Sequence, residues 1–214
     1  MNILILGCSF GVPENGCPAE MHTENQLRLL GHNVYNCARG GASNLESLAI
    51  GKQFLENNSA VDIDWVVWFH TEIGREFVSE KYHSYIYDIE KMAQIIYENY
   101  SKFLKSINAK VAIIGGAAPV YPNLFGHINP DFCIPYWFEE ILNLQLPETQ
   151  ILSKIELIEK FQCTGPDQKI KILEQHEEIL NALYASEDFP DNYHAGGRPH
   201  IELAQRLHDI FMGG

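Results

Sequence analysis

Basic residues are scarce in this chain of 214 residues. It carries 15 lysines and arginines against 28 aspartates and glutamates, which gives a net charge of −13 at pH 7. The few basic residues form no cluster along the sequence. Nucleic acids and anionic membrane surfaces bind proteins through dense positive charge, so we expect neither as a partner.

Long apolar runs are also missing. No stretch approaches the roughly 18–20 apolar residues that a membrane-spanning helix needs. The opening run, Ile3 to Leu6, ends at Gly7-Cys8 and looks like a lipid-attachment signal. However, no basic residue precedes it, and it is shorter than the roughly 7–15 residues of a signal-peptide core. We therefore expect neither a lipoprotein signal nor a membrane span.

Paired cysteines and phosphate-binding loops are absent as well. The five cysteines contain no C-x-x-C pair, which excludes a zinc knuckle. We interpret them as reduced thiols of a cytoplasmic protein and expect no metal. No G-x-x-x-x-G-K-[ST] loop occurs, and Phe10 and Pro13 follow Gly7 where a dinucleotide-binding loop needs small residues. A nucleotide-binding regulator therefore has little support, and we expect no cofactor.

What the chain does have is a large apolar content in an alternating pattern. It is 46% hydrophobic and 20% charged, which suits a folded domain with a large core. Short apolar runs near 2–6, 32–38, 64–70 and 110–120 alternate with helical patterns near 17–31, 43–58 and 84–107. A last helix at the C-terminus carries Pro199 near its first turn. This alternation predicts one α/β domain, a three-layer α/β/α fold with a parallel, flavodoxin-like sheet, over residues 1–214.

One region departs from the alternation. Residues 121–187 begin with a stretch rich in proline and aromatic residues, and helical patterns follow near 151–161 and 168–185. We interpret this region as an irregular and helical insertion that flanks the mouth of a site and sets substrate choice. Trp137 is its best candidate for stacking on a sugar, although core packing is the more common role of a tryptophan.

Candidate catalytic residues follow the expected strands. Ser9 comes directly after the first strand, and Asp191 and His194 stand three residues apart before the last helix. A nucleophilic serine needs a base, an acid that orients the base, and donors for the oxyanion. The spacing allows the Asp191 carboxylate to hold the His194 ring while its other nitrogen faces Ser9. A lone surface histidine is the simpler interpretation of His194 taken by itself.

Three short motifs, in order, carry a family resemblance. "GCSF" at residues 7–10, "NCARGG" at 36–41 and "DNYH" at 191–194 resemble the SGNH (GDSL-like) hydrolases, whose second histidine would be His200. "TEIGRE" resembles a segment of uncharacterised SGNH-like proteins of bacteria and phages. The resemblance implies that Ser9 is the nucleophile, His194 the base and Asp191 its orienting acid. It also implies that the backbone N–H groups of Ser9 and Gly41 bind the oxyanion.

Gly41 fits that role on physical grounds too, because it lies just before a helix start, where free N–H groups favour negative charge. A simple tight turn is the alternative, and Gly40 competes for the same role.

The sequence departs from the family pattern at two places. Cys8 stands where the family usually has aspartate, and the asparagine that supplies the third oxyanion donor is missing from "WFHTEIGRE". Thr71 could donate through its hydroxyl instead. Asn44 could reach the site or merely cap a helix. Arg75 could bind an anionic substrate group, or pair with Glu72 or Glu76.

The favoured function is hydrolysis of an ester, such as an acyl group on a glycan or a small molecule, by a Ser-His-Asp triad. The alternative is a catalytically weak or inactive SGNH-like domain that binds a glycan or a protein partner. The missing asparagine favours the alternative, and the complete set of triad candidates opposes it. The sequence does not indicate an oligomeric state.

Overall fold

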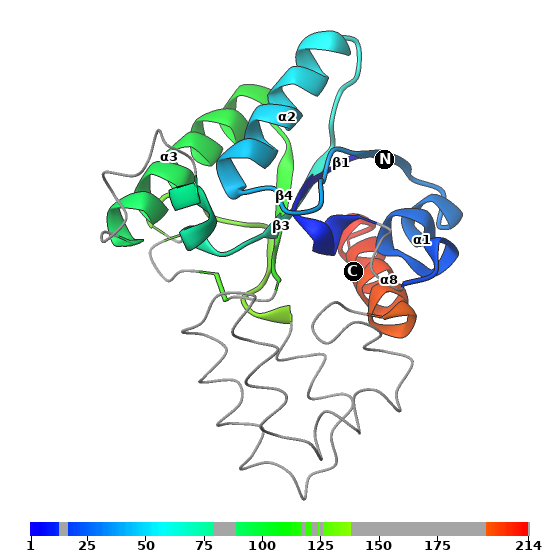
Figure 1. Cartoon of the computed structure of the whole chain (residues 1–214). Helices are drawn as coiled ribbons and strands as arrows, with labels where there is room; N and C mark the ends of the chain where they lie inside the picture. The colour runs from blue at the N-terminus through cyan, green and yellow to red at the C-terminus, as the bar shows by residue number, and fades with distance from the viewer. Residues whose placement is uncertain are drawn as a thin grey trace, which may run out of the picture.

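The computed structural model describes residues 1–12, 17–78, 89–116, 119–120, 124, 126–137 and 196–213 (Figure 1). Within them lies one sheet of five strands in the order β2-β1-β3-β4-β5, in which every neighbouring pair is parallel. The strands are β1 (Asn2–Gly7), β2 (Asn33–Asn36), β3 (Trp65–His70), β4 (Lys110–Gly115) and β5 (Phe132–Ile134). This is the flavodoxin-like order of doubly wound folds, and it confirms the predicted fold class.

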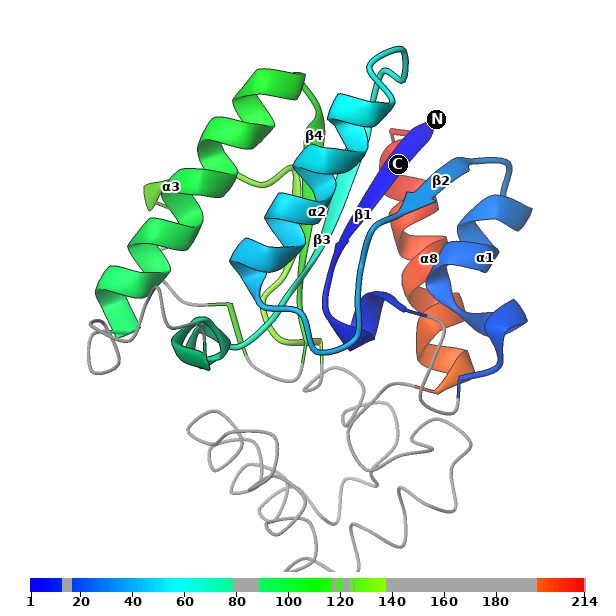
Figure 2. The same ribbon diagram turned by 45° about the horizontal axis from the view of Figure 1, so that its top comes forward.

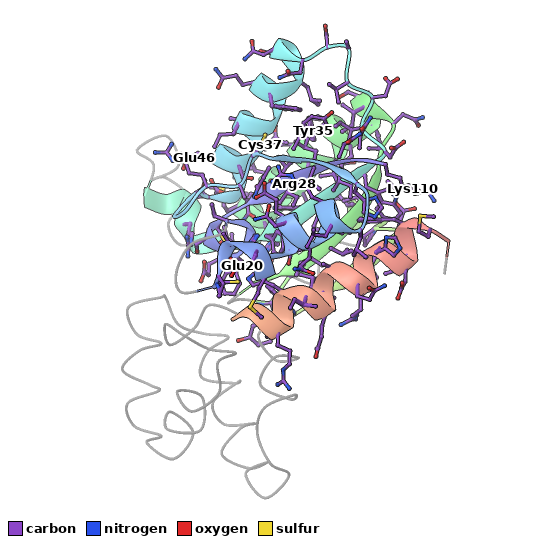
Figure 3. All side chains as sticks on the ribbon, turned by 90° about the vertical axis from the view of Figure 1, so that its right-hand side faces the viewer. Glu20, Arg28, Tyr35, Cys37, Glu46 and Lys110 are labelled. Carbon is purple, nitrogen blue, oxygen red and sulfur yellow. The ribbon has the colours of Figure 1, made fainter. Side chains whose placement is uncertain are left out.

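Helices cover both faces of the sheet (Figure 2). On one face, α1 (Thr23–Leu29) and α8 (Gly197–Phe211) lie side by side (Figure 3). On the other face lie α2 (Asn44–Asn57) and α3 (Ile89–Ile107). Short 3-10 turns stand at η1 (Ser9–Gly11), η2 (Ala19–Met21) and η3 (Ile73–Val78).

The apolar residues of the strands explain the three layers. Side chains of a strand point alternately to opposite faces, so Ile3 and Ile5 of β1 join the core under α1 and α8. Leu4 and Leu6 join the core under α2 and α3. A parallel strand covered on both faces needs such a continuous apolar run, and all of β3 is buried in the same way.

The first predicted helix starts later than expected. Residues 17–31 split into η2 and α1, because His22 between them has an extended backbone. The His22 ring accepts a hydrogen bond from the backbone N–H of Glu24 and so caps the first turn of α1. By contrast, Ser43 caps α2 as the S-x-x-E pattern predicts, because its hydroxyl accepts a hydrogen bond from the Glu46 N–H.

The region predicted to be irregular contributes a strand, which corrects the expectation for 121–187. Phe132–Ile134 pairs with β4 in parallel, and the Asp131 carboxylate accepts a hydrogen bond from the Val111 N–H. Pro130 and Pro135 flank this strand and hid it in the sequence, since proline is tolerated beside an edge strand. Residues 138–187 lie outside the described part of the chain.

Trp137 is a core residue, so the expectation of a sugar-stacking surface tryptophan was wrong. Its side chain is buried, and its ring packs against Phe10, Phe69 and His200. With only 3% of its surface exposed, it has no open face to offer a sugar. It joins the end of the sheet to the start of α8.

Among the described residues, no helix has the length and apolarity needed to cross a bilayer. The same part of the chain holds no group of three or more His, Cys, Asp and Glu side chains that could bind a metal ion.

Candidate active site

The site that topology favours lies beyond the carboxyl ends of β1 and β3. The chain leaves β1 for α1 on one face, but leaves β2 and β3 for α2 and α3 on the other. The connections that follow the adjacent strands β1 and β3 therefore leave on opposite faces of the sheet, and ligands of doubly wound folds bind at such a switch point. Ser9 follows β1, and Thr71 follows β3.

A turn that requires glycine at position 7 places Ser9 just after the end of β1. Gly7 has a φ of +140°, and a Cβ atom there would lie 2.5 Å from the carbonyl oxygen of Phe69, so only glycine fits. After the buried Cys8, the chain folds at once into η1, where the Gly11 N–H donates to the Cys8 carbonyl. Ser9 is the first residue of this turn and is partly exposed.

The glycine loop after β2 is tied to the same turn. The Arg39 N–H donates to the Gly7 carbonyl over 3.1 Å, and the Ala42 N–H donates back to the Arg39 carbonyl. Gly41, at the third position of this tight turn, is exposed and has a φ of +76°, a left-handed conformation that favours glycine. The two segments predicted to supply the oxyanion donors, Ser9 and Gly41, are therefore joined through Gly7.

Asn44 links the start of α2 to the end of β3 through its side-chain amide. Its side chain is buried, and its Oδ1 accepts hydrogen bonds from the Thr71 N–H (3.1 Å) and from Trp68 Nε1 (3.2 Å). Its Nδ2 donates to the Thr71 carbonyl over 2.9 Å. These bonds fix the first turn of α2 to the end of β3, and whether Asn44 also reaches the site stays a prediction.

Thr71 is also used within the protein. Its side chain is buried, and its hydroxyl donates to Glu72 Oε2 over 2.7 Å. A hydroxyl has one proton to donate, and in this arrangement that proton goes to Glu72. Thr71 as a replacement for the missing asparagine stays a prediction, and it requires the hydroxyl to turn away from Glu72.

Arg75 forms the ion pair that was the alternative to an anion-binding role. Its Nε donates to Glu72 Oε2 over 2.6 Å, and both side chains are largely buried. The same carboxylate oxygen thus accepts from Thr71 and from Arg75. Beyond β3, the Glu72 carboxylate is thus held by two side-chain donors of the protein itself.

Two of the three predicted triad residues, Asp191 and His194, lie outside the described residues. The helix that follows them is described. In its first turn, Nδ1 of the buried His200 lies 2.8 Å from Thr23 Oγ1. The His200 ring packs on Trp137, and Trp137 packs on Phe10, the neighbour of Ser9. The start of α8 is therefore linked by side-chain contacts to the serine turn.

Glu76 is a buried carboxylate that the sequence analysis considered only as a partner of Arg75. Only 1% of its surface is exposed. Its Oε2 accepts a hydrogen bond from the Ser43 hydroxyl (2.8 Å), and its Oε1 accepts one from the Leu45 N–H (2.9 Å). Burial raises the pKa of this carboxyl group above its usual value. The Ser43 cap was visible as a local pattern, but a partner 33 residues away was not.

Two buried histidines complete the surroundings of the site. Burial lowers the pKa of His22 to about 4 and that of His70 to about 3. Nε2 of His70, the last residue of β3, lies 3.1 Å from the Tyr97 hydroxyl. Both rings are therefore neutral at pH 7, and neither is a charged partner for a substrate.

The chain is similar to solved structures of hydrolases and esterases. A candidate SGNH hydrolase from Slackia heliotrinireducens is 18% identical with a TM-score of 0.45, covering 100% of this chain and 99% of that one. A carbohydrate acetylesterase from Sinorhizobium meliloti is 13% identical with a TM-score of 0.46, covering 99% and 98%. An aryl esterase from M. smegmatis is 12% identical with a TM-score of 0.46, covering 99% and 98%. No protein-family model and no curated protein matches the chain.

Proposed function

We propose that this protein hydrolyses an ester with Ser9 as nucleophile, His194 as base and Asp191 as the acid that orients it. The observation that carries the proposal is the position of Ser9. It opens a tight turn directly after a central strand, at the switch point of a doubly wound sheet. The ordered motifs that resemble the SGNH hydrolases support the same assignment.

The reaction proceeds in two steps. Ser9 Oγ attacks the ester carbonyl carbon while His194 takes the hydroxyl proton, and the tetrahedral oxyanion accepts hydrogen bonds from the N–H groups of Ser9 and Gly41. The intermediate collapses to an acyl-enzyme as His194 gives the proton to the leaving alcohol. Water, activated by His194, then hydrolyses the acyl-enzyme and restores Ser9. No step needs a cofactor.

The end of β3 limits the expected rate. Asn44 and Thr71 bond within the protein, so the oxyanion hole that we propose rests on backbone donors. Loss of one donor typically costs about 10²–10³ in rate, which predicts a slow or specialised esterase. We propose a small-molecule or glycan ester as the substrate class.

A second candidate function is supported by the carboxylate at Glu72. Thr71 and Arg75 both donate to this carboxylate, so in this arrangement neither donor is directed at an oxyanion. This arrangement favours the alternative of a catalytically weak SGNH-like domain that binds a glycan or a protein partner.

Labelling with a fluorophosphonate probe, read by intact mass and peptide mapping, separates the two. We expect one adduct on the parent protein, at Ser9, and none on Ser9→Ala or His194→Ala. Ser59→Ala is the matched control, because Ser59 is an exposed serine in a loop beyond α2, and it should label like the parent. Absence of any adduct on the folded parent would favour the binding domain.

A further inference from the structure

A carboxylate from a distant segment accepts hydrogen bonds from the first turn of α2. Glu76 stands in η3, beyond β3, yet its two oxygens accept from the Ser43 hydroxyl and the Leu45 N–H. The side chain is almost completely buried. A buried carboxylate is costly unless donors satisfy it, and here the free N–H groups and positive end of a helix supply them.

This contact fixes one end of the Gly41 loop. The loop runs from Arg39, whose N–H is held by the Gly7 carbonyl, to Ser43, whose hydroxyl is held by Glu76. Gly41 lies between these two anchors, in a left-handed turn that glycine adopts readily but does not itself enforce. Nothing packs within 4 Å of the point where a Gly41 Cβ would lie, so the direction of its N–H depends on the anchors.

We propose that Glu76 is a positioning residue: it holds the Gly41 loop so that the Gly41 N–H points at the oxyanion of the reaction at Ser9. The inference rests on the proposed function and adds to it a residue remote in sequence. Because Glu76 already accepts from donors at the N-terminus of α2, we infer that an anionic substrate group does not bind at that helix end. The catalytic contribution of the loop then comes from Gly41, before the helix begins.

The variants Glu76→Ala and Glu76→Gln test this. Alanine removes both acceptors, whereas glutamine keeps one carbonyl oxygen for the Leu45 N–H and loses the acceptor for the Ser43 hydroxyl. Leu104→Ala is the matched control, because it removes a buried side chain from the same layer. Leu104 lies near the C-terminal end of α3, which leads to the amino end of β4 and so away from the carboxyl ends of the strands. All variants are measured well below their own unfolding temperatures.

The first readout is the second-order rate constant for fluorophosphonate labelling of Ser9. We expect Glu76→Ala to label at least about tenfold more slowly than the parent, with Glu76→Gln between the two and Leu104→Ala within twofold of the parent. On an ester that the parent hydrolyses, kcat should fall while KM stays nearly constant, because the oxyanion forms only in the transition state. Backbone hydrogen exchange should accelerate over residues 39–45 in Glu76→Ala and not in Leu104→Ala.

The outcomes separate the two claims. Equal labelling rates for Glu76→Ala and the parent, with Ser9 still the labelled residue, would overturn the positioning role and leave the proposed function standing. An equal loss of rate in Leu104→Ala would also overturn it, since the effect would then follow stability alone. A folded parent that never labels would overturn the proposed function, and the positioning role with it.

Discussion

The carboxyl ends of the adjacent strands β1 and β3 lie side by side, but different interactions shape the chain after each of them. After β1, the backbone conformation of Gly7 allows the chain to turn, η1 follows within two residues, and the Asn36 amide donates to the Gly11 carbonyl. After β3, buried polar side chains shape it, through Asn44, Thr71 and Glu76. The turn after β1 requires a glycine conformation and has one side-chain hydrogen bond from a distant segment, whereas the end of β3 depends on several such bonds between segments about 30 residues apart.

The largest expected effect is at the end of β1. Gly7→Ala places a Cβ 2.5 Å from the Phe69 carbonyl oxygen in a conformation that L side chains rarely adopt. We expect it to lower the free energy of unfolding by about 3 kcal/mol or more, or to prevent folding. Urea unfolding measures this. Gly31→Ala is the control, because Gly31 also has a positive φ but nothing within 4 Å of its Cβ position. A similar small loss in both variants would show that the close approach is unimportant.

The next effect is at the end of β3. Asn44→Ala removes three hydrogen bonds and leaves the Thr71 N–H, the Thr71 carbonyl and Trp68 Nε1 buried without their partner. We expect a loss of about 2–4 kcal/mol in the free energy of unfolding, since each unsatisfied buried group costs roughly 1–3 kcal/mol and the effects are not additive. Asn57→Ala on the exposed end of α2 is the control and should cost far less. Equal free energies of unfolding for Asn44→Ala and Asn57→Ala would show that the hydrogen bonds of Asn44 do not stabilise the end of β3.

A pH series tests the buried histidines. The folded-state pKa values of His22 and His70 lie below the ordinary value of 6.5, at about 4 and about 3. The unfolded chain therefore binds protons first, so stability should be full above pH 6.5 and fall as the pH approaches 4. Between pH 7 and pH 5 we expect a loss of about 1–2 kcal/mol per histidine.

The raised pKa of Glu76 acts in the opposite direction. Its contribution is fully present below the unfolded pKa and is lost as the pH rises through the folded value, so it offsets part of the loss on acidification. Urea unfolding at both pH values, compared with His22→Asn/His70→Asn, checks the assignment. A double variant with the same pH dependence as the parent would refute it.

The smallest expected effect is that of Thr71→Val. Because the Thr71 hydroxyl already donates to Glu72, its removal takes no donor from the oxyanion. We expect the fluorophosphonate labelling rate of Ser9 to stay within about threefold of the parent, with a loss of stability of about 1 kcal/mol. A fall of about 10² in labelling rate would instead restore Thr71 as the third oxyanion donor.

The parallel sheet with helices on both faces and the position of Ser9 after β1 followed from local patterns. Apolar runs of β1 and β3 predicted buried parallel strands, and Ser43 predicted the start of α2, because these features depend on neighbouring residues. The short strand β5 was missed because three residues between prolines carry little pattern. Trp137 was misjudged because burial depends on neighbours, Phe10 and His200, that are remote in sequence.

The sequence by itself determined the three-layer fold, the glycine turn before Ser9 and the loop at Gly41, since periodicity and glycine conformations are local properties. Only the tertiary structure decided which polar groups remain available to a ligand. Asn44, Thr71 and Arg75 each carry suitable donors. Glu72 lies close to Thr71 and Arg75 along the chain, but only folding brings Trp68 and Thr71 to Asn44. It also brings the Glu76 carboxylate to the start of α2. These hydrogen bonds join residues that are distant in the sequence, so local sequence patterns cannot predict them.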